Sequence, residues 1–124
     1  MTRPFTVALA AFALCVAGST LAEQESPAGK DLFAKRCGGC HALDRDKEGP
    51  RLGGVYGRAG ASLDSFAYSE ALKKSKIVWG QENLERWLAD PDTLVPGNDM
   101  TFHVENAEER GAIIAYLKER SPRR

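Results

Sequence analysis

The sequence predicts an all-α domain of four or five short helices joined by long loops. Apolar side chains recur at helical spacing in four segments of the chain. The glycine-rich stretch at residues 52–60 shows no strand alternation that would support a sheet. Long connections are unusual in a compact domain, so this chain needs a reason for having them.

Residues 1–22 have the pattern of a secretory signal peptide. Arg3 makes the start positive, residues 5–17 form an uncharged apolar run, and Ala22 ends a small-residue cleavage site. We therefore expect residues 1–22 to be removed on export and residues 23–124 to form one domain. The run is short for a bilayer span, so no stable membrane insertion is expected; an uncleaved anchor is the alternative.

Charge and size limit the classes of function. Removal of residues 1–22 takes away only Arg3 among the charged residues, which leaves 16 Lys and Arg against 17 Asp and Glu, a formal charge of −1. The chain has no excess of basic residues of the kind that indicates nucleic-acid binding. The remaining chain suits one small, monomeric domain with a modest hydrophobic core.

The first predicted helix starts well, because Ser26 can cap it and Pro27 suits its first turn. Gly29, Phe33 and Cys37 share one face of that helix at helical spacing. A glycine inside a helix costs about 1 kcal/mol relative to alanine unless something packs closely against it.

That helix leads into Cys37-Gly38-Gly39-Cys40-His41, a C-x-x-C-H pattern that is typical of covalent haem attachment. Two thiols three positions apart can form thioethers with the two vinyl groups of one haem, and the adjacent histidine then lies beneath the iron. A redox dithiol leaves His41 unexplained, a zinc site needs four ligands, and a Cys37–Cys40 disulfide would close a tiny, strained loop. We therefore expect one haem c per chain, which also explains the long loops.

The middle of the chain is predicted to be mostly loop. Residues 42–50 are charged and solvated, and residues 52–60 lack the strand and spacing of a nucleotide site. Residues 65–74 predict a short helix with four inward side chains, Phe66, Ala67, Ala71 and Leu72. A basic cluster is interpreted as a solvated face rather than a docking patch: Lys73, Lys74 and Lys76.

Two further helices are predicted near the end of the chain. Residues 81–90 place Leu84, Trp87 and Leu88 on one face, and Pro91 follows as a stop. Residues 94–102 are an extended loop with a Pro96-Gly97 turn. The last helix, residues 107–120, has a capping box of Asn106 and Glu109 and a buried stripe of Ile113, Tyr116 and Leu117.

A haem iron has a sixth position, and Met100 is the preferred ligand for it. The only other methionine is Met1, which leaves with the signal peptide. A lone methionine is more often a packing residue, but Met100 follows a Pro-Gly turn on a polar loop and is not placed for a helix core. His103 is the competitor, and we interpret it as an exposed loop residue.

In their order and spacing, these segments resemble the class I cytochromes c, the mitochondrial type and its soluble bacterial relatives. The resemblance covers residues 27–120 and rests on several motifs: Cys37-Gly38-Gly39-Cys40-His41, Gly49-Pro50-Arg51-Leu52, Pro96-Gly97-Asn98-Asp99-Met100 and Ile113-Ile114-Ala115-Tyr116-Leu117. It implies the cytochrome c fold, in which the N- and C-terminal helices cross with Gly29 and Phe33 against Tyr116.

The resemblance also implies a role for each site residue. Cys37 and Cys40 would carry the thioethers, and His41 and Met100 would be the axial ligands. The carbonyl of Pro50 would accept the imidazole N–H of His41. Four donors would bind the haem propionates, namely Arg58, Tyr68, Trp79 and Asn98. Trp87 and Phe102 would line the haem pocket.

The implied function is an exported monohaem one-electron carrier rather than an enzyme, with no catalytic residues. Its partners would be redox proteins: cytochrome complexes, oxidases, reductases or dehydrogenases. Asp99 stands where mitochondrial members usually have lysine, so we expect a mixed or mildly acidic docking edge. The alternatives are a peroxidase-like or gas-binding haem protein, which needs an open sixth position, and an electron-entry subunit of a larger oxidoreductase.

Overall fold

The computed structural model describes Pro4, Gly18 and residues 27–123. Of the expected signal peptide, only Pro4 and Gly18 are among the described residues. The expected cleavage before Glu23 and the Ser26 cap lie outside the described residues. The elements are α1 (Pro27–Leu32), the π-helical turn η1 (Phe33–Cys37), α2 (Glu70–Ser75), α3 (Gln81–Ala89), α4 (Pro91–Leu94) and α5 (Ala107–Glu119).

The all-α prediction is confirmed. Within residues 27–123, extended pairing is limited to one isolated bridge between Ala59 and Val78. In the same part of the chain, every helix is too short or too polar to cross a bilayer. The long connections predicted from the sequence are also present, since the whole of residues 38–69 separates the end of η1 from the start of α2.

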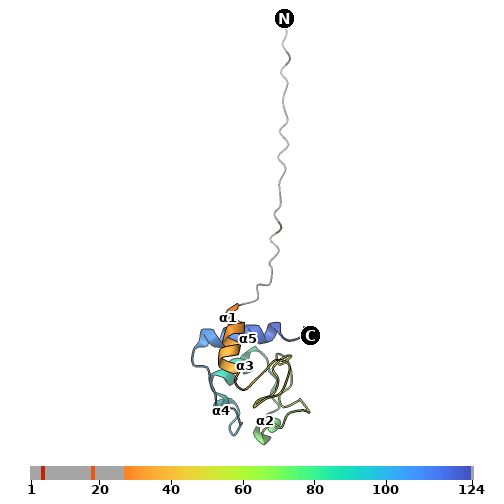
Figure 1. The fold of residues 1–124 in the computed structure, drawn as a ribbon, viewed down its shortest axis with the longest axis vertical. Helices are drawn as coiled ribbons and strands as arrows, with labels where there is room; N and C mark the ends of the chain where they lie inside the picture. Colours follow the sequence, from red (N-terminus) through yellow and green to blue (C-terminus); the bar gives the residue numbers. More distant parts are fainter. Residues whose placement is uncertain (1–3, 5–17, 19–26, 124) are drawn as a thin grey trace.

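The first and last helices, α1 and α5, cross, as the family resemblance implied (Figure 1). Gly29 is buried at this crossing, and a Cβ atom built on it would lie 2.6 Å from the Ala112 carbonyl oxygen and 2.8 Å from Cβ of Tyr116. The rings of Phe33 and Tyr116 pack nearby, with centroids 5.5 Å apart. The close approach explains why a glycine stands inside α1.

The helix that carries the cysteines widens just before them, which the sequence did not predict. The Gly38 N–H donates to the Phe33 carbonyl over 2.9 Å, the i to i+5 bond of a π-helical turn. Such turns often occur at functional sites. Arg36 in this turn makes a two-point bond to Glu109 of α5, with N–O distances of 3.0 and 3.2 Å.

Two boundaries differ from the prediction. α2 begins at Glu70 rather than residue 65, because the Ser69 hydroxyl accepts the Leu72 N–H at 3.1 Å and caps the helix there. Ala67 therefore lies in the loop before α2 and is exposed instead of facing inward.

The second difference is α4, which the sequence predicted as the end of α3 followed by loop. Pro91 is the first residue of α4, a position where its missing N–H and fixed φ are tolerated. Asp90 ends α3 and caps α4. The proline that stops one helix thus starts the next.

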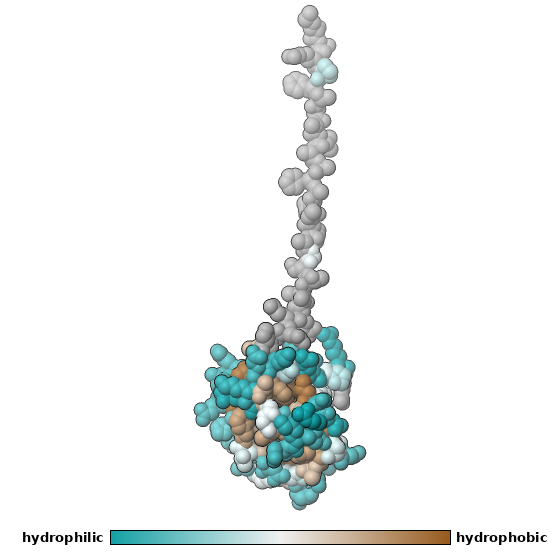
Figure 2. Space-filling view, in the orientation of Figure 1, coloured by the Kyte–Doolittle hydropathy of each residue, from teal (hydrophilic) through white to brown (hydrophobic). Residues whose placement is uncertain are grey.

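The core is centred on α5. Ile113 and Ile114 are completely buried, and Leu84 and Leu88 of α3 belong to the same hydrophobic cluster. Hydrophobic residues also reach the surface between hydrophilic ones in the middle of the face in Figure 2. Half of the predicted capping box is present, because the Asn106 side chain accepts two N–H groups at the start of α5.

Replacing Gly29 with alanine is expected to destabilise the protein, although alanine favours a helix by about 1 kcal/mol. The new methyl group would meet the Ala112 carbonyl, and such overpacking typically costs about 1–3 kcal/mol. Denaturant unfolding of the purified protein measures the net effect.

Gly111→Ala is the matched control. Gly111 lies in α5, and a methyl group added to it would have nothing within 4 Å, so alanine there should stabilise by about 0.4–1 kcal/mol. Equal stabilities of the two variants would contradict the close crossing.

Candidate functional site

The two cysteines lie at the end of η1 in a tight turn. Cys37 is buried, Cys40 is exposed, and both are free thiols. The N–H groups of Cys40 and His41 donate to the Cys37 carbonyl at 3.1 and 2.8 Å. Burial, with a smaller contribution from Cys40, raises the pKa of the Cys37 thiol to about 11. The Cys37 thiol is therefore mainly protonated at neutral pH.

His41 is held in one tautomer. Its Nδ1 lies 2.8 Å from the Pro50 carbonyl oxygen, which can only accept, so Nδ1 carries the hydrogen and Nε2 keeps its lone pair. Burial lowers the pKa of His41, the Pro50 carbonyl opposes this shift, and the Lys47 charge adds to it. The imidazole is therefore neutral at neutral pH, the form that binds a metal.

Gly49 backs the imidazole ring, a role that the sequence did not reveal. The Gly49 N–H donates to the Cys40 carbonyl at 2.8 Å, which folds the loop back onto the cysteine turn. A Cβ atom at position 49 would overlap the His41 ring. In the sequence, Gly49 stood out only as part of the Gly49-Pro50-Arg51-Leu52 motif, from which a role was inferred for Pro50 and none for Gly49.

The Met100 backbone is fixed by a network of short-range hydrogen bonds. Gly97 has a φ of +84°, and its N–H donates to the Asp92 carboxylate at 3.3 Å. The Asn98 side chain accepts the Met100 N–H at 2.7 Å and donates to the Val95 carbonyl at 2.9 Å. This is an ordered loop, as the Pro-Gly turn predicted.

The Met100 side chain is half-buried and has a polar partner. Nε1–H of Trp87 on α3 donates to Sδ of Met100 at 3.1 Å. The Trp87 ring packs against the edge of Trp79, with centroids 5.1 Å apart at 64°. Sequence analysis predicted Trp87 as a pocket residue, but the contact with the Met100 sulfur was not foreseen because the two residues lie on separate elements.

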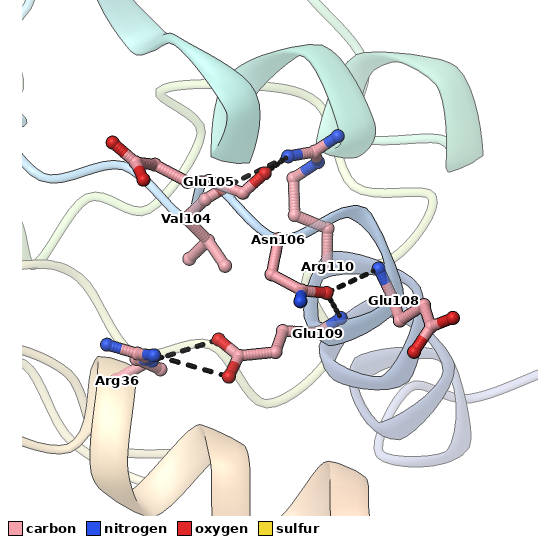
Figure 3. A network of polar contacts seen from close by, with 7 residues as sticks. All are labelled: Arg36, Val104, Glu105, Asn106, Glu108, Glu109 and Arg110. Atoms are coloured by element: carbon pink, nitrogen blue, oxygen red, sulfur yellow. Dashed lines mark hydrogen bonds and ion pairs between the residues drawn. The ribbon is translucent and has the colours of Figure 1, made fainter.

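His103 is exposed, as expected. Its side chain is 53% accessible, and Nε2 lies 3.6 Å from the Glu105 carboxylate. The loop that carries it is fastened to α5 by Arg110, whose Nη1 donates to the carbonyls of Val104 and Glu105, each at 2.8 Å (Figure 3). Arg110 Nε also donates to Glu85 of α3 at 2.5 Å.

The other predicted site residues are spread around these two groups. Arg58 donates to the carbonyls of Arg51 and Gly53 at 3.0 and 3.3 Å, and the Tyr68 hydroxyl accepts the Leu63 N–H at 3.4 Å. Phe102 is 42% exposed. One hydrophobic cluster includes or borders several of the site residues: Cys37, Tyr68, Trp79, Trp87 and Met100. It thus brings the cysteine and methionine regions to the same core.

The donor set fits a haem better than a metal ion alone. Among the described residues, no group of three or more His, Cys, Asp or Glu side chains could hold a metal ion. The chain instead offers two free thiols three positions apart, a neutral imidazole with Nε2 available, and a thioether. These are the groups that covalent attachment and two axial bonds require.

Comparison with known proteins gives one consistent result. A family model described as Cytochrome c matches residues 26–121, which include every helix above. Cytochrome c of Chlamydomonas reinhardtii is 39% identical over 104 residues, covering 77% of this chain and 93% of that protein. Cytochrome c2 iso-2 of Magnetospirillum molischianum is 39% identical over 97 residues, covering 76% and 96%. The structure of cytochrome cH from Methylobacterium extorquens superposes with a TM-score of 0.70 at 42% identity, covering 74% and 95%.

The Asp90 cap predicts a specific pH dependence. Hydrogen bonds from the Thr93 hydroxyl at 2.6 Å and the Thr93 N–H at 3.2 Å lower the pKa of Asp90. A lowered pKa stabilises the folded protein above the unfolded pKa of about 3.9, and this contribution is lost as the pH falls through the folded pKa. The non-titrating variant Asp90→Asn should therefore be less stable than wild type at pH 7, by a margin that shrinks at acid pH.

Unfolding of both proteins by denaturant at several pH values measures this margin. Thr93→Val is the control, because it removes the hydroxyl donor and should reduce the pH-dependent part. A margin that is the same at every pH would contradict the role of the Asp90 charge.

Proposed function

This chain belongs to the cytochrome c family, and from this premise we propose that it is an exported electron carrier whose haem iron is ligated by His41 and Met100. Family membership itself gives the coarser statement, which is one covalently attached haem c per chain and electron transfer with redox proteins rather than catalysis. Residues 1–22 have a signal-peptide pattern, which supports removal of that segment and a periplasmic location for residues 23–124.

The His41–Pro50 hydrogen bond beside two free thiols is the observation that carries the proposal. The haem, when bound, supplies an iron that accepts and releases one electron. Cys37 and Cys40 would hold it covalently, and Nε2 of His41 would bind its iron. The Pro50 carbonyl keeps the imidazole oriented and raises its basicity.

Sδ of Met100 would supply the second protein ligand of the iron. Its backbone is held by Asn98 and its loop by Arg110, so both ligands stand on supported segments. Little rearrangement is then needed when the iron changes charge, which suits rapid electron transfer. A methionine ligand also favours a high reduction potential.

Donors near the core suit the haem propionates, because a buried carboxylate needs hydrogen bonds. We assign this role to Arg58, Tyr68, Trp79 and Asn98. Trp79 is buried, and the other three are partly buried. Trp87 and Phe102 would contact the ring system.

Met100→Ala tests the ligand assignment. Loss of the thioether should open the iron to cyanide and carbon monoxide and lower the reduction potential. Binding of carbon monoxide to the reduced protein, followed by absorption, measures this change. His103→Ala is the control and should bind no carbon monoxide, since His103 is exposed. The reverse pattern would assign the sixth position to His103.

The surface next to Met100 suggests how the protein meets its partners. Three acidic residues close to Met100 in the sequence are exposed: Asp92, Asp99 and Glu105. Thr101 and Phe102, which directly follow Met100, are also exposed. The chain is formally neutral, and only Arg3 among its charged residues lies in the segment expected to be removed. We infer that docking relies on apolar contact inside a mixed or mildly acidic rim, so its rate should depend weakly on salt.

Asp99→Lys should speed electron transfer to an acidic-faced mitochondrial-type oxidase, because it places a positive charge at the docking edge. Stopped-flow rates at several salt concentrations measure the effect. Glu119→Lys is the control, since it makes the same change of charge at the end of α5. A steep fall of the wild-type rate with salt would contradict the weakly charged rim.

A further inference from the structure

We propose that Ser121, which follows the last helix, is a positioning residue for the propionate donors Arg58 and Trp79 and thereby keeps the reduction potential of the haem iron high. The inference rests on the propionate role proposed for those two residues. Its starting point is a hydrogen bond from the Tyr56 N–H to the Ser121 hydroxyl at 3.1 Å, which joins positions 65 residues apart in the chain.

Ser121 fastens the glycine-rich stretch, residues 52–60, to the end of α5. Its hydroxyl donates to the Leu117 carbonyl at 2.8 Å while it accepts the Tyr56 N–H. A serine hydroxyl has one donor and two acceptor positions, so both bonds can form together. One residue earlier, the Arg120 carbonyl accepts the Gly54 N–H at 3.1 Å. Two consecutive residues after α5 thus hold two amides of the same stretch.

Side chains support this attachment. Val55 is 3% exposed and belongs to the hydrophobic core. The Lys118 ammonium lies 5.5 Å from the centroid of the Tyr56 ring. Gly54 has a φ of +81°, a conformation that favours glycine, and a Cβ built on it would stand 4.0 Å from Cδ of Pro122. The end of α5 and the glycine-rich stretch therefore behave as one unit.

The same stretch sets the position of both propionate donors. Arg58 lies within it, and its guanidinium donates to the Gly53 carbonyl at 3.3 Å. Trp79 is joined to it by two backbone bonds: the Gly57 N–H donates to the Trp79 carbonyl at 2.6 Å, and the Trp79 N–H donates to the Arg58 carbonyl at 2.9 Å. The amide that Ser121 holds is therefore one residue away from the first of these bonds.

The effect on the potential follows from charge. A propionate is negative and stabilises the oxidised iron, because charges in a partly buried site are poorly screened. Arg58 is partly buried and Trp79 is buried, and their N–H groups would offset part of that negative charge. Without the Ser121 hydroxyl, the Tyr56 N–H loses its acceptor and the stretch is held less firmly. The donors then compensate the propionate less well, the oxidised form gains, and the potential falls.

Two replacements of Ser121 test this role in the haem-loaded protein. Ser121→Ala removes the hydroxyl, and Ser121→Thr keeps it. We expect alanine to lower the equilibrium constant for reduction about two- to fivefold, or about 18–41 mV at 59 mV per tenfold for one electron, and threonine to keep the wild-type value. Potentials are measured by spectroelectrochemical titration. Amide hydrogen exchange followed by NMR should become faster at Tyr56, Gly57 and Trp79 in the alanine variant alone.

Ser75→Ala is the control for the loss of a hydroxyl after a helix. The Ser75 hydroxyl donates to the Leu72 carbonyl at 2.6 Å at the end of α2, and its other contact is the Ile77 N–H two residues later. This variant should lose stability and keep the wild-type potential. A fall in Ser75→Ala equal to that in Ser121→Ala would assign the effect to general loosening and overturn the inference.

Arg58→Gln separates the inference from the proposed function, because it removes the guanidinium charge directly. A lower potential in Arg58→Gln with a wild-type potential in Ser121→Ala would overturn the role of Ser121 and leave the propionate role standing. Faster exchange confined to the Tyr56 amide, with Gly57 and Trp79 unchanged, would also overturn it. A wild-type potential in Arg58→Gln would overturn both.

Discussion

The close crossing of α1 and α5 at Gly29 fixes the haem-attachment turn relative to the rest of the chain. No Cβ fits there, so the helices approach until Phe33 meets the Tyr116 ring. The Arg36–Glu109 bond then secures η1 to α5 immediately before Cys37 (Figure 3). The turn with its two thiols and imidazole therefore takes its position from the last helix of the chain, although it lies near the beginning of the domain.

The same helix positions the other side of the site. Arg110 of α5 holds the carbonyls that follow Met100 and also bonds to Glu85 of α3, the helix that carries Trp87. α5 is thus the common reference for both proposed axial ligands, which come from segments that lie far apart in the sequence. The completely buried side chains of Ile113 and Ile114 anchor α5 in the hydrophobic core. A carrier that changes charge without changing shape needs such a fixed frame.

Much of this could be predicted from local sequence. The cysteine turn, the Pro-Gly loop before Met100 and the last helix each depend on neighbouring residues, so spacing and capping rules were enough to find them. The crossing at Gly29 came from the family resemblance and is confirmed. What the sequence could not give were contacts between distant side chains, such as Trp87 with Met100. Gly49 was missed for the same reason, because a side chain at position 49 is excluded only by the His41 ring, which packs against it in the folded chain.

The central claim is that one haem iron is bound by the His41 imidazole on one side and the Met100 thioether on the other. X-ray absorption at the iron edge of the purified wild-type protein tests it most directly, because the first shell distinguishes sulfur from nitrogen. The account predicts a six-coordinate iron with a single sulfur among nitrogen ligands, in both oxidation states. A shell made only of nitrogens, or an iron lacking a sixth ligand, would contradict it.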